Sequence, residues 1–185
     1  MMQQLPLFDV DSSWSPPDVL PDWQNADLVA IDTETRDPSL KDAGPGWPWG
    51  GGYVVGYAIG LLQGEKTHTY YLPVKHEGGG NLDGGIVQRY VDEIARAQIP
   101  KVFHNSLYDI GWMRAEGINT VHGPIHDTQI AAALLDENRL SYSLDNLCKE
   151  WLGGGKDEKQ LKEAAAIWGL KNTKANLWQL PARHV

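Results

Sequence analysis

The stretch Leu28-Val29-Ala30-Ile31-Asp32-Thr33-Glu34-Thr35 is an apolar run that ends in two carboxylates one residue apart. We expect residues 27–36 to form a β-strand, in which side chains at i and i+2 point to the same face, so Asp32 and Glu34 should project together. Two like charges held side by side are costly to bury unless cations neutralise them. The pair is therefore a candidate metal site, and the commoner alternative is two solvent-exposed carboxylates at a strand end.

Strand-like and helix-like segments alternate along the rest of the chain. Residues 53–62 and 67–74 are β-rich runs joined by a short polar turn, which predicts an antiparallel hairpin. Residues 86–95 have helical spacing, and 101–104 are expected to form a short strand. Further helices are expected at 106–116, 127–137, 144–152 and 159–168. This order predicts an α/β fold with a mixed sheet.

The composition is that of one intracellular domain. The chain has 185 residues, of which 42% are hydrophobic, enough for one well-buried core. Its single cysteine excludes an internal disulfide, and no signal peptide or membrane span is evident, so we expect a soluble, cytoplasmic protein. Residues 1–26, rich in Pro, Asp and Ser, are expected to be an extended, partly disordered leader, and residues 27–185 the folded domain.

The charge distribution is uneven. The net charge of -8 argues at first against a nucleic-acid binder. Residues 149–185, however, hold seven basic and four acidic residues, which leaves the acidic excess in residues 1–148. An enzyme that holds phosphates through divalent cations can be acidic overall, because the ions reverse the local field. The net charge therefore neither supports nor excludes binding of nucleic acid.

A second polar pair lies where the strand 101–104 meets the following helix. Asn105 and Asp109 are four residues apart and so share one helical face. Taken separately, they are best explained as a helix N-cap and a first-turn acid that complements the helix dipole.

Together the two pairs resemble the DEDD superfamily of 3′–5′ exonucleases, and most closely the proofreading domain of phage-type family A DNA polymerases. Residues 29–35 (Val-Ala-Ile-Asp-Thr-Glu-Thr) are similar to the first exonuclease motif, and residues 103–109 (Phe-His-Asn-Ser-Leu-Tyr-Asp) to the second. His126-Asp127-Thr128 resembles the segment that follows. The resemblance implies a ribonuclease H-like fold with a mixed, five-stranded sheet and hydrolysis of DNA 3′ ends.

The resemblance also implies roles for individual residues. Asp32 would bridge two divalent ions, Mg²⁺ or Mn²⁺, while Glu34 would hold the ion on the side of the nucleophile and Asp109 the other. The terminal nucleotides of DNA would be bound by Thr35, Asn105 and Tyr108, with His104 beside them. We expect Asp127 to be a helix N-cap rather than a metal ligand.

Two further groups have open interpretations. Trp47 and Trp49, in a Gly- and Pro-rich loop, would either stack on a frayed 3′ end or fold back onto the domain, and we favour the second. Five lysines would either follow a DNA backbone or belong to a solvated face: Lys156, Lys159, Lys162, Lys171 and Lys174.

The third motif of the family is missing from this sequence. It is a Tyr-x-x-x-Asp that supplies a general base and a fourth carboxylate, and in phage relatives it closely follows a Leu-Pro-Ala-Arg segment. Here residues 180–183 have that sequence, but no Tyr-x-x-x-Asp occurs after Asp109. Either the completing residues lie elsewhere and the chain is a fragment or split product, or it is a catalytically incomplete module that binds nucleic acid or a sliding clamp.

The leader contains a possible partner-binding peptide. Residues 4–8, Gln-Leu-Pro-Leu-Phe, resemble the peptide by which bacterial replication proteins bind the sliding clamp. Gln4 would hydrogen-bond the clamp, while Leu5, Leu7 and Phe8 would present apolar side chains, of which Leu7 and Phe8 enter an apolar pocket. The alternative is that these apolar residues pack the leader onto its own domain.

Overall fold

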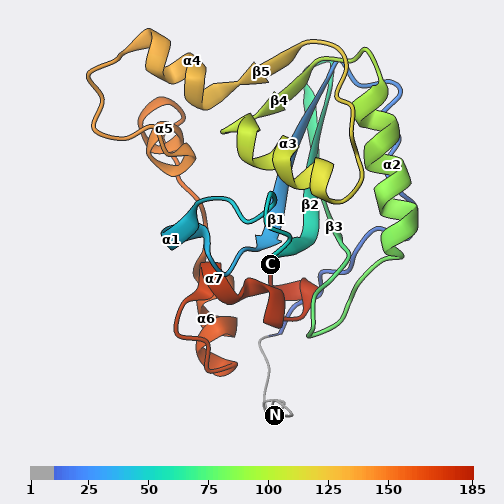
Figure 1. The fold of residues 1–185 in the computed structure, drawn as a ribbon, viewed down its shortest axis with the longest axis vertical. Helices are drawn as coiled ribbons and strands as arrows, with labels where there is room; N and C mark the ends of the chain where they lie inside the picture. The colour runs from blue at the N-terminus through green and yellow to red at the C-terminus, as the bar shows by residue number, and fades with distance from the viewer. Residues whose placement is uncertain (1–10) are drawn as a thin grey trace.

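The computed structural model describes residues 11–185, and their central element is β1 (Leu28–Arg36), the strand that carries the first acidic pair (Figure 1). It lies in the middle of a five-stranded sheet of order β3-β2-β1-β4-β5. β1 pairs antiparallel with β2 (Tyr53–Gln63) and parallel with β4 (Lys101–Phe103). The predicted mixed sheet is therefore confirmed.

The two edges of the sheet differ in how readily the sequence predicts them. β3 (Lys66–Pro73) forms the expected antiparallel hairpin with β2. β5 (Ile125–Asp127) pairs parallel with β4 at the other edge and has only three residues. A run of three residues is too short to show a strand period, so the local pattern did not predict β5.

Five of the helices match the predicted ranges to within two residues. They are α2 (Gly84–Arg96), α3 (Ser106–Ala115), α4 (Thr128–Leu135), α5 (Leu144–Trp151) and α6 (Lys159–Ile167). The single-turn and 3₁₀ helices were not predicted, because they are too short to show a helical period. They are α1 (Leu40–Ala43), α7 (Thr173–Asn176), η1 (Leu177–Gln179) and η2 (Ala182–His184). Within residues 11–185, none of the helices has the length and apolarity that a bilayer crossing requires.

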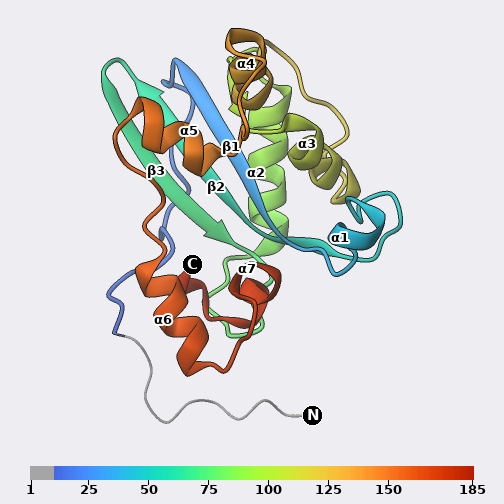
Figure 2. The same ribbon diagram turned by 90° about the vertical axis from the view of Figure 1, so that its left-hand side faces the viewer.

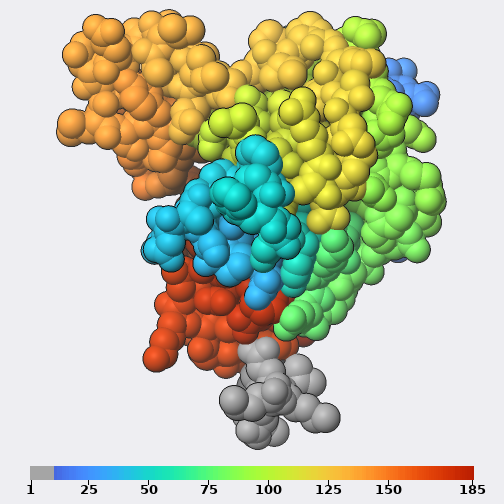
Figure 3. Space-filling model, viewed as in Figure 1, coloured from blue at the N-terminus to red at the C-terminus, as the bar shows by residue number. Residues whose placement is uncertain are grey.

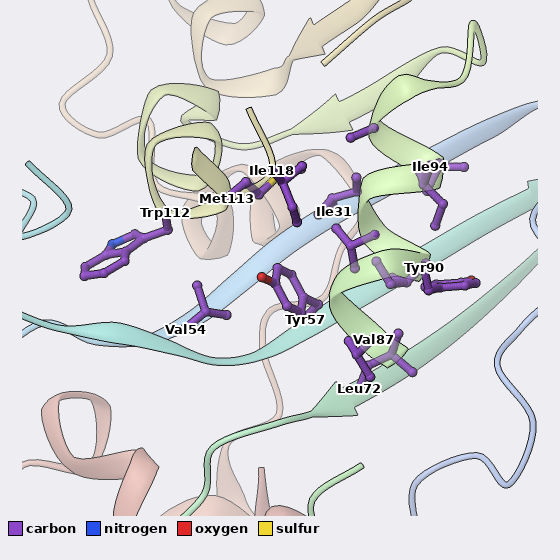
Figure 4. Close-up of a cluster of buried hydrophobic side chains, with 14 of the residues drawn as sticks. Ile31, Val54, Tyr57, Leu72, Val87, Tyr90, Ile94, Trp112, Met113 and Ile118 are labelled. Atoms are coloured by element: carbon purple, nitrogen blue, oxygen red, sulfur yellow. The ribbon is translucent and has the colours of Figure 1, made fainter. Parts of the chain in front are cut away.

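The hydrophobic core lies between one face of the sheet and helices α2 and α3 (Figure 4). Val87, Val91 and Ile94 of α2 are fully buried at helical spacing. Trp112 and Met113 of α3 join them. Burying a side chain of this size contributes about 1.5–3 kcal/mol, so these contacts fix both helices against β1.

The opposite face of the sheet is covered more loosely. Figure 1 shows α5 on the side of the sheet away from α2, and Figure 2 shows it crossing the strands. An apolar cavity of about 330 Å³ lies there, and Ala30, Ala58, Val102 and Leu144 are among its lining residues. In Figure 3 the α4–α5 segment forms a lobe at the upper left, with the C-terminal helices at the lower left.

Both terminal segments of the described chain pack against the domain. Near the N-terminus, Leu20 and Trp23 contact the core without forming a helix or strand. Near the C-terminus, the buried His76 side chain hydrogen-bonds the Leu180 carbonyl through Nδ1 at 2.9 Å. A Cβ on Gly78 would lie 2.2 Å from the nitrogen of Pro181, so only glycine allows this approach of the two segments.

Candidate active site

The first acidic pair lies on the face of β1 that the strand period predicted. Val29, Ile31 and Thr33 are buried on the core side. Asp32 and Glu34 alternate with them and point the other way, Asp32 solvent-exposed and Glu34 half-buried. A bulge between Glu34 and Thr35 shifts the register with β2 just after the pair. Bulges of this kind redirect side chains and are frequent beside active sites.

Asp109 reaches the same strand from the first turn of α3. Its Oδ1 accepts hydrogen bonds from the backbone N–H of Thr33 at 2.9 Å and from the Thr33 hydroxyl at 2.7 Å. Asp109 is only 2% exposed. Thr33 lies between Asp32 and Glu34 in the sequence. By hydrogen-bonding Asp109 it links the two motifs and fixes the position of the third carboxylate.

One cavity of about 660 Å³ collects the predicted site residues. Asp32, Glu34 and Asp109 line it, together with Thr35, His104, Asn105 and Tyr108. The Thr35 and Tyr108 hydroxyls lie 2.7 Å apart in a hydrogen bond. His104 hydrogen-bonds the Thr128 hydroxyl through Nδ1 at 2.9 Å. Several lining residues were not predicted as site residues: Asp37, Leu40, Lys41, Asp42, Asn172 and Leu177.

Burial makes the three carboxylates reluctant to ionise, and repulsion by neighbouring carboxylates adds to this effect at Glu34 and Asp109. Burial, followed by the charges of Asp32 and Asp109, raises the pKa of Glu34 to about 7. Burial also raises the pKa of Asp109 to about 7, against the effect of the Thr33 hydrogen bonds. The protein around the Asp32 carboxyl group also raises its pKa by desolvation, although the residue as a whole is solvent-exposed, and nearby Lys156 and His104 oppose that rise. The cavity thus concentrates negative charge that the neighbouring protein cations offset only in part.

The donor set suits a hard divalent cation. Carboxylate oxygens are the ligands that Mg²⁺ and Mn²⁺ prefer, and raised carboxylate pKa values are expected where such an ion supplies the missing positive charge. As they stand, no three His, Cys, Asp or Glu side chains within residues 11–185 lie close enough together to form a metal cluster. Asp109 Oδ1 is instead held by Thr33.

The junction of β4 and α3 differs from the prediction in one respect. Asn105 occupies the N-cap position of α3, but its side chain makes no capping hydrogen bond. Its φ of 71° is the only positive value of a non-glycine residue among those described. A left-handed residue at such a turn is unfavourable and is often retained where a site needs it.

Asp127 supplies the cap that Asn105 does not. It caps α4, accepting from the N–H groups of Gln129 and Ile130, as predicted. It also accepts from Ser106 N–H at 2.6 Å and Asn105 N–H at 3.2 Å. Burial alone would raise the pKa of Asp127, but these backbone hydrogen bonds hold it at about 2. One carboxylate thus fixes the start of two helices beside the cavity.

The structure distinguishes between the alternatives for the two loop tryptophans and for the five lysines. Trp47 packs against the core, whereas Trp49 is 72% exposed, so the favoured interpretation is correct for Trp47 alone. Lys156 and Lys174 line the cavity; Lys159, Lys162 and Lys171 do not. Residues 4–8, the clamp-like peptide, lie outside the described residues.

Comparison with known proteins bears on the family of this chain. Residues 51–179 match the model of the 3′–5′ exonuclease domain of family A DNA polymerases. The chain belongs to this family. It is 39% identical over 193 residues to a DNA-directed DNA polymerase of Pseudomonas phage M6, covering 98% of the chain and 28% of the phage protein. It is 31% identical over 127 residues to DNA polymerase I of Synechocystis, covering 66% of the chain and 11% of that protein.

The chain therefore spans less than a third of the polymerases that it matches. Among solved structures, it is similar to Brucella melitensis NrnC bound to pGG, with a TM-score of 0.52, 21% identity and coverage of 85% of this chain and 76% of that one. At this identity the likeness shows the fold, which is that of ribonuclease H-like exonucleases. The chain is thus a 3′–5′ exonuclease domain of this family.

Proposed function

We propose that this exonuclease domain removes nucleotides from DNA 3′ ends by two-metal-ion phosphodiester hydrolysis. The observation that carries the proposal is that the carboxylates of both motifs line one cavity and have raised pKa values. Residues 27–185 would form the nuclease unit and residues 1–26 a leader. By analogy with its phage relative, the protein would act in the host cytoplasm.

Asp32, Glu34 and Asp109 are the residues that would hold the metal ions. Bound divalent ions would supply Lewis-acid chemistry there, favouring an activated water and stabilising the leaving 3′ oxygen. Thr33 would orient Asp109 through its two hydrogen bonds. Because Tyr-x-x-x-Asp is absent from this sequence, the general base is missing and we expect the activity of this chain to be impaired.

The terminal nucleotides would lie along the α3 side of the cavity. The hydroxyls of Thr35 and Tyr108 are already hydrogen-bonded to each other, which orients the Tyr108 ring. Asn105 and His104 line the same cavity. Aromatic stacking and backbone contacts of this kind bind any base, as a proofreading nuclease requires.

Replacing Asp32 by Ala should abolish specific Mn²⁺ binding, because one of the three carboxylates proposed to hold the metal is lost. Isothermal titration calorimetry of the parent and of Asp32→Ala measures the effect directly. Asp92→Ala is the matched control, since Asp92 lies on α2, pairs with Arg96 and does not line the cavity. An Asp32→Ala variant that binds Mn²⁺ as tightly as the parent would show that the metal site is assigned wrongly.

A binding function is the second candidate, carried by the Gln-Leu-Pro-Leu-Phe sequence of residues 4–8. We propose that this peptide binds a bacterial sliding clamp, because an extended apolar peptide with an anchoring Gln suits a shallow apolar pocket. Replacing Leu7 and Phe8 together by Ala should eliminate co-elution with the clamp. Fluorescence anisotropy of a labelled peptide of residues 1–12 provides the direct measurement. Lack of saturable binding at high micromolar clamp would exclude the idea.

A further inference from the structure

The lysines that line the cavity come from the segment after α5, which the exonuclease motifs do not include. Lys156 lies in the loop between α5 and α6, and Lys174 lies in α7. Both face the cavity that holds Asp32, Glu34 and Asp109. They also offset the carboxylate charges: Lys156 acts on Asp32 and Glu34, and Lys174 on Glu34.

The loop that carries Lys156 has a defined shape. Gly153 has a φ of +72°, in the left-handed region that favours glycine. A Cβ on Gly155 would lie 2.6 Å from Lys149 Cε and 2.7 Å from Asp145 Oδ1, so a larger residue would displace the loop. The backbone N–H of Lys156 donates to Asp145 Oδ1 at 3.0 Å. Gly153 and Gly155 therefore give the loop a defined course that brings Lys156 to the cavity.

The ammonium group of Lys156 is available to a ligand. Three other lysines of this region each pair with a carboxylate: Lys149 with Asp145, and Lys162 and Lys174 with Glu158. Within residues 11–185, Lys156 Nζ makes no ion pair or side-chain hydrogen bond, and the residue is exposed to solvent. It lowers the pKa of Asp32 and Glu34 electrostatically without forming an ion pair with either among the described residues.

We propose that Lys156 binds a backbone phosphate of the DNA strand whose 3′ end enters the cavity. This inference rests on the proposed function and adds a protein cation to it. The acidic cavity by itself repels a polyanion, and a lysine in the lining of the cavity supplies attraction that does not depend on metal. A compact ammonium suits phosphate because it binds as a point charge. A lysine that served only as counter-ion to Asp32 would be expected to contact it.

The chain offers a closely matched control. Lys159 is three residues away, is exposed, forms no ion pair among the described residues and does not line the cavity. Lys156→Gln and Lys159→Gln thus change the net charge equally. Lys156→Arg keeps the charge and tests whether charge alone is required.

Binding should be measured by fluorescence anisotropy of a labelled single-stranded oligonucleotide with a free 3′ end. EDTA is present to remove metal ions and so prevent cleavage. We expect Lys156→Gln to weaken binding about tenfold, the value of one charge-assisted contact. The salt dependence of log K should become shallower by about 0.7, the contribution of one phosphate on a single strand. Lys159→Gln should stay within about twofold of the parent, and Lys156→Arg should retain most of the affinity.

Two results would overturn the proposal, and they differ in what else they overturn. If Lys156→Gln and Lys159→Gln bind DNA equally well while Mn²⁺ binding tightens only in Lys156→Gln, Lys156 is a counter-ion and the nuclease assignment stands. If the parent itself neither binds nor degrades DNA, the proposed function fails together with this inference.

Discussion

Replacing Asp109 by Asn should lower 3′–5′ hydrolysis about a thousandfold and, at the same time, stabilise the metal-free protein above pH 7. The loss of activity follows because a metal ligand supports several kcal/mol of transition-state stabilisation. The gain in stability follows because the cavity holds a carboxylate that burial disfavours. An asparagine Oδ1 can still accept the hydrogen bonds that Thr33 donates to Asp109.

The stabilisation by Asp109→Asn should increase with pH. The ordinary pKa of Asp109 is 3.8, and in the folded protein it is about 7. The folded state therefore binds more protons than the unfolded state between about pH 4 and pH 7, so this group's contribution to the free energy of unfolding falls as pH rises through that window. Asparagine does not titrate, so its advantage over Asp109 should be small at pH 4 and full above pH 7.

Thermal unfolding in EDTA at pH 4 and pH 8 measures this difference. For a chain of this length, each kcal/mol appears as a shift of about 2–4 °C in Tm. Asp92→Asn is the control, because Asp92 lies outside the cavity. The same shift at both pH values would mean that Asp109 titrates normally, and a variant that remains fully active would remove Asp109 from the metal site.

Local periodicity was sufficient to predict the part of the site that lies on β1. The alternation of Ile31 and Thr33 with Asp32 and Glu34 is a property of any strand, so the shared face followed from the sequence. The position of Asp109 was predicted only through the resemblance of its motif. Its contact with Thr33 joins residues 76 positions apart, and no local pattern encodes such a pair.

The features that escaped prediction depend on tertiary contacts. Asn105 was expected to cap α3, but Asp127 takes that role because β5 places it beside the start of α3. Asp127 was correctly predicted to cap α4, and its second function requires a strand too short to recognise. The sequence around the lysines near the C-terminus does not show which of them lines the cavity. Lys156 lines it and Lys159 does not, and the chain course at Gly153 and Gly155 that leads to Lys156 is a tertiary feature.

Adding a Gly-Pro-Tyr-x-x-x-Asp segment after Val185 should raise the rate of 3′-end hydrolysis at least about a hundredfold. A general base alone contributes about 10²–10⁴ in rate. A recovered metal ligand would add less than its separate value, because the two deficits overlap. The unextended chain should cleave slowly, and faster with Mn²⁺ than with Mg²⁺, since Mn²⁺ tolerates an incomplete ligand set.

The structure supports this extension because the residues that precede it are anchored to the domain, beginning with Leu177 at the cavity. Leu177 lines the cavity, the Trp178 ring lies under the Arg36 guanidinium at 4.9 Å, and the Leu180 carbonyl is held by His76. Rates should be compared on a labelled single-stranded oligonucleotide, with an extension carrying Phe for Tyr and Asn for Asp as the inert control. If the active extension folds, binds Mn²⁺ and still cleaves no faster than its control, the missing motif does not limit this chain. The catalytic interpretation then fails, and a binding module becomes the better account.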